Sequence, residues 1–478
     1  MISFIDLITN FCMSKISTAL LFALVFQLSS NAQQNQVDSI IRDADVCGIQ
    51  LIHVKNGREQ DLNAGTISDK SPVKVNSATI FEAASLSKSV FAYIVLRLSD
   101  RGIINLDSPL LRYIGTYWRF DPKDPAFGKI TARMVLRHTT GLPNWGADSS
   151  VHLIFPPDSC FSYSGEGYWF LQTVIEKKLN KSLNEIAIEE VFVPLNMTSS
   201  SYVWNSKFEK TSSFPPTREN IEAHSRANAA FSLLTNAHDY TIFLDALMNG
   251  KGLKPETQKL MFSEASAANR FNEKENNADP FIAWGLGVGL QKNEKGKSVW
   301  HWGDNGAYKC FYMAYPDQHE SLVYFTHSQN GMNIASELTE LFFGAQTCWV
   351  MKWLTYGYDS PLVIKAFRTE LTKAGYNHAS EIITAKKKND PGFNITEKDL
   401  NNLGYLLMGE GKTKEALEIF KVNTALYPGS WNVYDSQAEA HENLNEKDLA
   451  IQYYRRSIEL NPGNENAKAH LQKLEGQK

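Results

Sequence analysis

The last quarter of the chain contains a repeat with a period of 34 residues. Gly404, Ala416, Phe420 and Pro428 recur 34 residues later as Ala438, Ala450, Tyr454 and Pro462. A fixed period of this length indicates stacked helix pairs, because each repeat can bury its apolar face only against its neighbours. The pattern predicts clear repeats over residues 398–431 and 432–465, inside an all-α region that extends over residues 362–478.

This period, with small residues at those positions, resembles the tetratricopeptide repeat. Two repeats alone bury little surface, so residues 362–390 are interpreted as a degenerate first helix pair and residues 463–474 as a final capping helix. Residues 348–361 are assigned to a linker. The resemblance implies a protein or peptide partner at the repeats, and nothing in the sequence identifies that partner.

A serine and a lysine stand three residues apart where a helix is predicted to begin. Residues 85–101 are expected to form an amphipathic helix, because apolar residues recur there at helical spacing. Residues i and i+3 share one helix face, which places the Ser85 hydroxyl beside the Lys88 amine. A partly desolvated lysine can take the proton of a serine, so the pair is interpreted as a nucleophile and its activating amine. In isolation, the same spacing is also typical of a solvated helix face.

Two later stretches carry residues typical of a cleft. Tyr163-Ser164-Gly165 lies at a loop-to-helix corner, from which a tyrosine can point into a cleft. His301-Trp302-Gly303 lies on a predicted strand, with a glycine where another backbone or a ligand comes close. Residues 284–290 are predicted to be a neighbouring strand. His138, in the stretch 136–143, is interpreted as a core or capping histidine.

These features follow one another in the order of a known family. The chain resembles the serine beta-lactamase and penicillin-binding-protein superfamily, in its class C and related esterase or peptidase branch. The resemblance covers roughly residues 36–345, and residues 36–347 are assigned to a serine hydrolase domain. It rests on the stretches 81–88, 136–143, 161–168, 193–197 and 301–306.

The resemblance implies a role for each of these polar residues. Ser85 would form the acyl-enzyme, Lys88 would hold the site positive and shuttle the proton, and Tyr163 would act as general base, its phenolate favoured by the nearby ammonium. The backbone amides of Ser85 and Asp304 would face the oxyanion. The residues expected to bind substrate are His301, Gly303 and Gly165.

The chain also departs from the family's pattern. The family's motif at the position of Tyr163-Ser164-Gly165 commonly ends in asparagine, whereas Gly165 offers only backbone. His301 and Trp302 stand where beta-lactamases usually have lysine and threonine, and His301 would contribute hydrogen bonding or a pH-dependent charge. These departures favour esterases and D-amino-acid peptidases over efficient beta-lactamases. Glu166 is interpreted as a carboxylate at a helix N-terminus and not as a deacylation base.

The expected fold is an α/β (α+β) beta-lactamase-like fold followed by the all-α tetratricopeptide-repeat domain. Residues 47–55 and a run ending at Gly65 predict a hairpin around Asn56-Gly57. The resemblance implies an antiparallel sheet built from both ends of the hydrolase region, flanked by helices. A mainly helical subdomain is expected between about residues 105 and 280, with Ser85 at the floor of the cleft beside it.

The first residues indicate export. Lys15 precedes an apolar run over residues 19–28, and Ser30-Asn31-Ala32 offers small residues before a cleavage site, so residues 1–32 are predicted to be a signal peptide cut after Ala32. Met13 is an alternative start. The apolar run is short for a membrane span, so no stable span is expected after cleavage. The predicted location is the periplasm or outside the cell.

Composition excludes some classes of function. The net charge of −4 leaves no basic surplus, which argues against a nucleic-acid partner. No zinc-site motif is present, so neither a metal nor a cofactor is expected. The sequence does not decide which disulfides form, if any, among Cys47, Cys160, Cys310 and Cys348.

Two hypotheses for function follow. The first is a secreted serine hydrolase that cleaves an ester or amide, in a small molecule or a peptide, through an acyl-enzyme on Ser85. The alternative is a non-catalytic or slowly acylating ligand sensor that acts through its repeats. Retention of Ser85, Lys88 and Tyr163 together favours the hydrolase, because a binding module needs none of them.

Overall fold

The computed structural model describes residues 32–146, 150–273, 276–354, 362–389 and 395–476. The chain divides into two units, Met1–Leu354 and Thr355–Lys478. Each unit is described by itself below.

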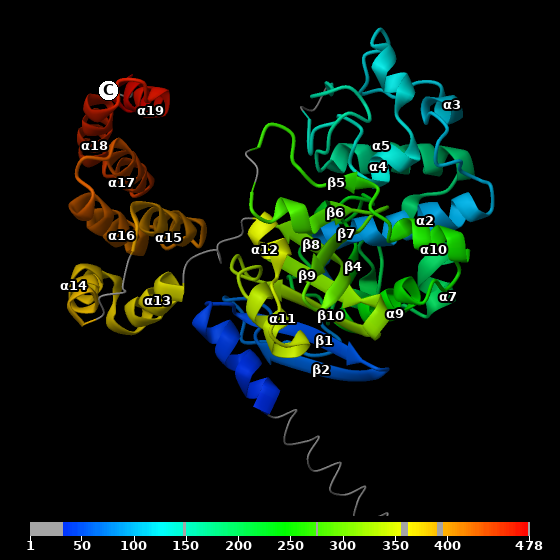
Figure 1. Ribbon diagram of the computed structural model, residues 1–478, viewed down its shortest axis with the longest axis horizontal. Helices are drawn as coiled ribbons and strands as arrows, with labels where there is room; N and C mark the ends of the chain where they lie inside the picture. The colour runs from blue at the N-terminus through cyan, green and yellow to red at the C-terminus, as the bar shows by residue number, and fades with distance from the viewer. Residues whose placement is uncertain (1–31, 147–149, 274–275, 355–361, 390–394, 477–478) are drawn as a thin grey trace, which may run out of the picture. The chain divides into compact units, whose positions relative to one another are not determined.

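An eight-stranded antiparallel sheet forms the centre of the first unit (Figure 1). Its strand order is β2-β1-β10-β9-β8-β7-β6-β5. The strands are β1 Gly48–Lys55, β2 Arg58–Gly65, β5 Ser266–Ala267, β6 Ile282–Trp284, β7 Gly289–Asn293, β8 Gly296–Asn305, β9 Tyr308–Tyr315 and β10 Glu320–His327. Because β1 and β2 come from one end of the unit and β5–β10 from the other, the expected construction of the sheet is confirmed.

The first hairpin is confirmed as well. Asn56 and Gly57 have φ angles of 52° and 73° between β1 and β2. This pair of left-handed residues makes the tight turn whose twist matches that of the flanking strands.

One strand prediction is only partly right. Trp284 ends β6 and residues 289–290 begin β7, but residues 285–288 form the turn between these strands, closed by a hydrogen bond from the Gly285 N–H to the Val288 carbonyl at 2.9 Å. Gly287 has φ of +84°, and a Cβ there would lie 2.0 Å from Ala92 Cβ. The glycines that suggested a strand with a close neighbour therefore serve a tight turn pressed against a helix.

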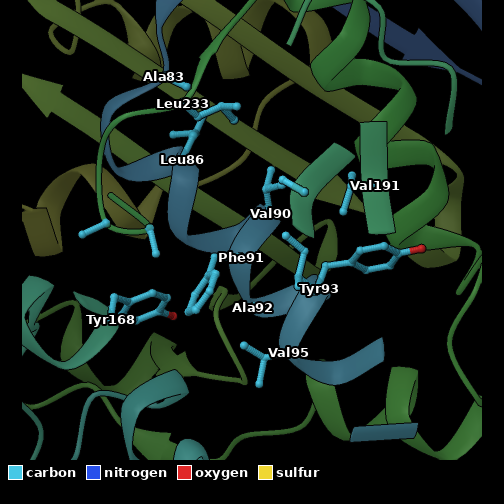
Figure 2. Close-up of a cluster of buried hydrophobic side chains, with 14 of the residues drawn as sticks. Ala83, Leu86, Val90, Phe91, Ala92, Tyr93, Val95, Tyr168, Val191 and Leu233 are labelled. Carbon is cyan, nitrogen blue, oxygen red and sulfur yellow. The ribbon is translucent and has the colours of Figure 1, made fainter. Parts of the chain in front are cut away.

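The helix that carries Lys88 runs through the core of the first unit. A 3₁₀ turn, η1 (Ala84–Leu86), leads into α2 (Ser87–Asp100). The five apolar residues that predicted this helix are all fully buried: Val90, Phe91, Ile94, Val95 and Leu98. Figure 2 shows Phe91 beside Tyr168 on one side of α2 and Tyr93 beside Val191 on another. The helix is buried on almost every face, which fixes its N-terminal turn in place.

The expected mainly helical subdomain is confirmed. The two-stranded sheet of β3 (Phe81–Glu82) and β4 (Leu234–Thr235) joins it to the residues just before η1. Its helices are α3 Leu111–Ile114, α4 Ala132–Leu136, α5 Gly165–Leu179, α6 Leu183–Ala187, α7 Val193–Leu195, α8 Arg218–Ala223, α9 Ala237–Met248 and α10 Pro255–Met261.

The predicted linker over residues 348–361 begins too early. After α11 (Ala335–Phe343), residues 349–354 form α12 (Trp349–Leu354). Val350 N–H donates to Gln291 Oε1 at 3.0 Å, and Trp353 Nε1 donates to the Ala268 carbonyl at 3.1 Å. These bonds and the burial of its apolar side chains make α12 part of the first unit. Residues 355–361 lie outside the described residues.

The second unit is built from helices. They are α13 Leu362–Ala374, α14 Ala379–Asn389, α15 Glu397–Gly409, α16 Thr413–Leu426, α17 Trp431–Asn443, α18 Lys447–Leu460 and α19 Glu465–Gly476. The residues that marked the 34-residue period include Ala416, Ala438 and Ala450, and all three are fully buried. Small side chains suit these positions, because paired helices meet there and leave little room. The predicted first helix pair and final capping helix are present as α13–α14 and α19.

Three other predictions meet the structure only in part. The predicted signal peptide lies outside the described residues, except for Ala32, which begins a helix over residues 32–43. Among the described helices, none has the length and apolarity to cross a membrane. The four cysteines Cys47, Cys160, Cys310 and Cys348 are all free thiols.

Candidate active site

The nucleophile candidate stands on a strained turn. Ser85 lies in η1, and the residue before it, Ala84, has φ of +43°. A non-glycine residue in this region costs about 1–3 kcal/mol, which the surrounding structure must offset. Ser87 holds the turn, because its Oγ donates to the Ala84 carbonyl at 2.5 Å and accepts the Leu233 N–H at 3.0 Å.

Strand β8 packs directly against this turn through Gly303. A Cβ on Gly303 would lie 2.7 Å from the Ala83 carbonyl oxygen and 3.0 Å from Ala84 Cβ. The Cys310 thiol, on the neighbouring strand β9, donates to the same carbonyl at 3.0 Å. The stretch His301-Trp302-Gly303 is therefore in contact with the nucleophile turn, and only glycine allows that approach.

Lys88 completes the predicted pair. Its Nζ lies 3.1 Å from Ser85 Oγ and donates to the Ala230 carbonyl at 2.9 Å. The side chain is buried, and this loss of solvent holds the pKa of Lys88 well below its usual value. Burial thus favours the neutral amine, which can accept the serine proton, over the permanently positive lysine that the resemblance implied.

Tyr163 is brought to the same place. Lys88 Nζ lies 4.7 Å from the centroid of the Tyr163 ring, and Trp302 and His138 pack on that ring at 4.6 and 4.4 Å. The expected stabilisation of a phenolate by a charged lysine is weaker than predicted, since burial disfavours that charge. Its role as general base remains a prediction.

His138 is a buried histidine that positions the Tyr163 corner. It has φ of +59°, and its Nδ1 accepts the Ser164 N–H at 3.0 Å, so its other ring nitrogen carries the proton. Burial and the nearby Lys88 keep the pKa of His138 well below its usual value. The interpretation as a core histidine is confirmed, although its place beside Tyr163 also makes it part of the site.

His301 lies on β8 and is fully buried. Its Nδ1 donates to the Trp302 carbonyl at 2.8 Å. Burial, with a smaller effect of Lys88, lowers the pKa of His301 to about 3. Of the two expected contributions, hydrogen bonding or a pH-dependent charge, the lowered pKa favours hydrogen bonding, because the imidazole stays neutral at ordinary pH.

The oxyanion site predicted from the amides of Ser85 and Asp304 fits the contact between β8 and η1. The Asp304 carboxylate accepts the Gly306 N–H at 3.0 Å and the Lys309 ammonium at 2.6 Å. These bonds fix the end of β8, which supports the position of the Asp304 backbone. The oxyanion role itself stays a prediction.

The backbone of Gly165 is engaged within the protein. Its N–H donates to Asn144 Oδ1 at 3.0 Å and to the Asn144 carbonyl at 3.1 Å. A Cβ at Gly165 would also lie 2.6 Å from the Trp145 ring. Its amide is therefore not free for a substrate, and the predicted binding of substrate by Gly165 stays a prediction.

The sequence did not reveal the rim of the site. The carboxamide of Asn144 contacts Gly165, since its Oδ1 accepts the Gly165 N–H at 3.0 Å. The family's pattern has an asparagine at the position of Gly165. Trp145 and Phe231 form an edge-to-face pair with centroids 5.7 Å apart, and they are 47% and 37% exposed. Phe231 directly follows Ala230, the partner of Lys88. Chain order gives no signal for this pair, because its members come from distant loops.

Glu166 is held in a buried ion pair. Its Oε1 accepts Arg119 Nη2 at 2.8 Å and the Gly146 N–H at 3.0 Å, and both side chains of the ion pair are at most 4% exposed. Glu166 lies in the first turn of α5, as predicted. The pair ties the loop that carries Trp145 to α5, a structural role.

Changing Glu166 to glutamine is expected to lower the free energy of unfolding by about 3–5 kcal/mol, because it leaves the Arg119 charge buried without its carboxylate. Denaturant unfolding measures this loss. The matched control is Glu189→Gln, whose exposed pair with Lys181 is expected to be worth at most about 1 kcal/mol. If Glu166 were the deacylation base instead, the glutamine variant would accumulate acyl-enzyme, as seen by intact mass.

A cavity of about 830 Å³ lies away from these residues. It is lined by the end of α10, by strands β5–β8 and by Pro316 and Asp317, and none of the predicted site residues lines it. The contacts around Ser85 therefore define the candidate site better than cavity size does.

A half-buried serine beside a buried lysine at the start of a core helix, against an antiparallel sheet, defines a class of serine hydrolases. The beta-lactamase family model matches residues 34–342 of this chain. The chain therefore belongs to the beta-lactamase family. A tetratricopeptide repeat model matches residues 432–464, so the second unit carries repeats of that kind.

Relatives and solved structures agree with this family. Penicillin-binding protein 4* of Bacillus subtilis is 25% identical over 304 residues, which cover 55% of this chain and 63% of that protein. This chain thus spans less than two thirds of that relative's length.

Two solved structures share the fold. The beta-lactamase/D-alanine carboxypeptidase of Pseudomonas syringae superposes with a TM-score of 0.55 and 12% identity, covering 66% of this chain and 98% of that chain. The D-amino acid amidase of Ochrobactrum anthropi SV3 superposes with a TM-score of 0.52 and 19% identity, covering 65% and 97%.

Proposed function

We propose that this chain is a serine hydrolase that cleaves an ester or amide through an acyl-enzyme on Ser85. The observation that carries the proposal is the contact between Lys88 Nζ and Ser85 Oγ at 3.1 Å, with the lysine desolvated. A neutral amine at this distance can remove the hydroxyl proton as the serine attacks a carbonyl carbon.

The residues around the pair suggest the remaining steps. In acylation the Ser85 proton passes to Lys88, and the oxyanion of the tetrahedral intermediate faces the amides of Ser85 and Asp304. The protonated Lys88 then gives its proton to the leaving amine or alcohol, with Tyr163 beside it as a relay. In deacylation a water attacks the acyl ester, and Lys88 or Tyr163 takes its proton.

The proposal includes the cellular compartment in which the enzyme acts. The predicted signal peptide supports a location in the periplasm or outside the cell, where peptides with D-amino acids are accessible substrates. The similarity to a penicillin-binding protein and the fold shared with a D-amino acid amidase support this choice of substrates.

A second candidate function is a ligand sensor that acylates slowly and signals through its repeats. The observation that favours it is the repeat unit itself, which a hydrolase does not need for chemistry. In this case a substrate would form an adduct on Ser85 that persists.

The test is labelling with a fluorophosphonate followed by intact mass and peptide mapping. The proposal expects one adduct per chain, mapped to Ser85 and absent in Ser85→Ala. The matched control is Ser263→Ala, a change of an exposed serine, which is expected to label like the wild type. Failure of the wild type to label, or a label elsewhere, would contradict the proposal.

A further inference from the structure

The carboxylate of Glu82 joins three segments that build the site. Glu82 lies on β3, three residues before Ser85. Its Oε2 accepts a hydrogen bond from Asn305 Nδ2 at 2.6 Å, and Asn305 is the last residue of β8, next to Asp304. Its Oε1 lies 3.1 Å from His224 Nε2. The Glu82 side chain therefore connects the nucleophile turn to the end of β8 and to the segment that begins at His224.

The segment that follows His224 supplies a partner of Lys88. It leads to Ala230, whose carbonyl accepts a hydrogen bond from Lys88 Nζ at 2.9 Å, and to Phe231 at the rim of the site. Asn305 Nδ2 also lies 3.4 Å from the Phe231 carbonyl oxygen. A shift of this segment would therefore move the carbonyl that holds the lysine beside the nucleophile.

The His224 ring lies between two hydrogen-bond acceptors. Its Nδ1 is 2.6 Å from the Asn220 carbonyl oxygen, and its Nε2 faces the Glu82 carboxylate. A neutral imidazole has one N–H and one lone pair, so it can donate to only one of these groups, whereas the imidazolium donates to both. Burial alone would lower the pKa of His224, but its hydrogen bonds to Glu82 and Asn220 raise that pKa above its ordinary value. Geometry and electrostatics thus favour the charged ring.

The near surroundings of His224 also suit a cation. Phe214 stacks on the ring with centroids 4.5 Å apart, and the C-terminal end of α8, which His224 caps, carries a partial negative charge. On α8 itself, Arg218 and Glu222 are exposed and pair with each other, and Arg226 is exposed two residues further on. The charged group that acts on the ring is therefore Glu82.

The groups of β8 and β9 near Glu82 leave this pairing intact. Asp304 is paired with Lys309, 2.6 Å away. The Tyr308 hydroxyl and the Cys310 thiol have raised pKa values, above all because they are buried, so both stay neutral in the pH range where a histidine titrates. His224 is thus the group of this cluster whose charge changes near neutral pH.

We propose that His224 and Glu82 are positioning residues: the ion pair between them, which needs a protonated His224, keeps the partner carbonyl of Lys88 and the oxyanion amides in their working positions. This inference rests on the proposed function of Ser85. Neither His224 nor Glu82 touches the reacting atoms, and both act through the segments that they join.

The ion pair gives the reaction a second pH limit. Deprotonation of His224 leaves a lone pair against either the Glu82 carboxylate or the Asn220 carbonyl, so the link opens. Because the folded pKa of His224 is raised, the pair is complete below the ordinary value of 6.5 and is lost as the pH rises through the raised value. The rate is therefore expected to fall at alkaline pH through His224, in addition to its fall at acid pH through Lys88.

The test measures how fast a fluorophosphonate labels Ser85 in the full-length chain between about pH 5 and about pH 10. This probe needs no knowledge of the substrate, and the wild type is expected to give a bell-shaped profile. His224→Gln is expected to label about tenfold more slowly at the optimum, because the lysine and the oxyanion site are less well placed, and to lose the alkaline fall. A wild type without an alkaline fall, or an unchanged fall in folded His224→Gln, would overturn the inference.

Two further variants separate charge from packing. His224→Arg keeps a cation that can stack on Phe214, so it is expected to label within about threefold of the wild type and without the alkaline fall. Glu82→Gln keeps an acceptor for Asn305 and removes the negative charge, so the alkaline fall is expected to move to lower pH. Should the His224 variants fail to fold, the wild type and Glu82→Gln decide the matter, because a fall that stayed in place would contradict the inference.

The matched control is His238→Gln, a change of an exposed histidine on α9. It is expected to keep the rate and the pH profile of the wild type. Loss of the alkaline fall in this control as well would remove the assignment to His224.

The inference and the proposed function fail differently. Labelling of Ser85 with an alkaline limit that does not depend on His224 or Glu82 contradicts the inference and leaves the proposed function standing. The absence of labelling in the wild type at every pH overturns both.

Discussion

Replacing Lys88 with methionine is expected to slow acylation of Ser85 by about 10³-fold, the usual contribution of a positioned general base. The structural reason is that Nζ lies 3.1 Å from Ser85 Oγ and is desolvated. Methionine has a similar length and no amine, so the pocket stays filled. Stopped-flow measurement of product release, with Lys88→Arg as a second variant that cannot act as a base, gives the acylation rate. An unchanged rate in either variant would remove Lys88 from the chemistry.

The lowered pKa of Lys88 has two pH consequences. Activity requires the neutral amine, so it should fall as the pH drops through the pKa of Lys88, which burial holds well below its usual value. The unfolded chain binds this proton more tightly than the folded one, so the cost of burying Lys88 shrinks as the pH rises toward 10.5.

Lys88→Met removes that cost. The variant is therefore expected to be at least as stable as the wild type at pH 7, and its advantage is expected to shrink at higher pH. Urea unfolding at several pH values measures this, and an advantage that grew with pH would contradict the assignment.

Gly303→Ala is expected to lower kcat by about 10²-fold, the scale of losing one oxyanion donor. The added Cβ would lie 2.3 Å from Cys310 Sγ and 2.7 Å from the Ala83 carbonyl oxygen, so β8 and the nucleophile turn must separate. That separation moves the amide of Asp304 away from Ser85. KM is expected to change less, because most of the damage is to the transition state.

A matched control is available for this substitution. Gly128→Ala adds the same methyl group to an exposed glycine of the first unit, where nothing lies within 4 Å of the new Cβ. It is expected to leave both activity and stability unchanged. Full activity in a folded Gly303→Ala variant would show that the contact between β8 and η1 does not position the oxyanion site.

Local features of the fold were predictable from sequence. The helix bearing Lys88 follows from apolar spacing, the first hairpin from Asn56-Gly57, and the helix pairs of the second unit from the 34-residue period. Each of these signals lies within one short segment, where periodicity and turn chemistry act directly. The single strand predicted at residues 284–290 is interrupted by a turn over residues 285–288, because the same glycines suit a tight turn equally well.

The site was predictable only as a set of residues. Sequence order brought Ser85, Lys88, Tyr163 and His301 together through the resemblance, but their protonation depends on burial. The neutral state of His301 and the lowered pKa of Lys88 follow from packing by segments far away in the chain. Asn144 and the pair of Trp145 with Phe231 were missed because long-range contacts between loops leave no periodic pattern.

The most direct test of the central claim is the initial rate of hydrolysis by wild type and Ser85→Ala on p-nitrophenyl esters, D-alanyl peptides with their amides, and a chromogenic cephalosporin. The account predicts hydrolysis by the wild type that falls by at least about 10⁴-fold in the variant, as for other nucleophile deletions. Equal rates in both proteins, or none in either, would contradict it and would direct attention to the repeats.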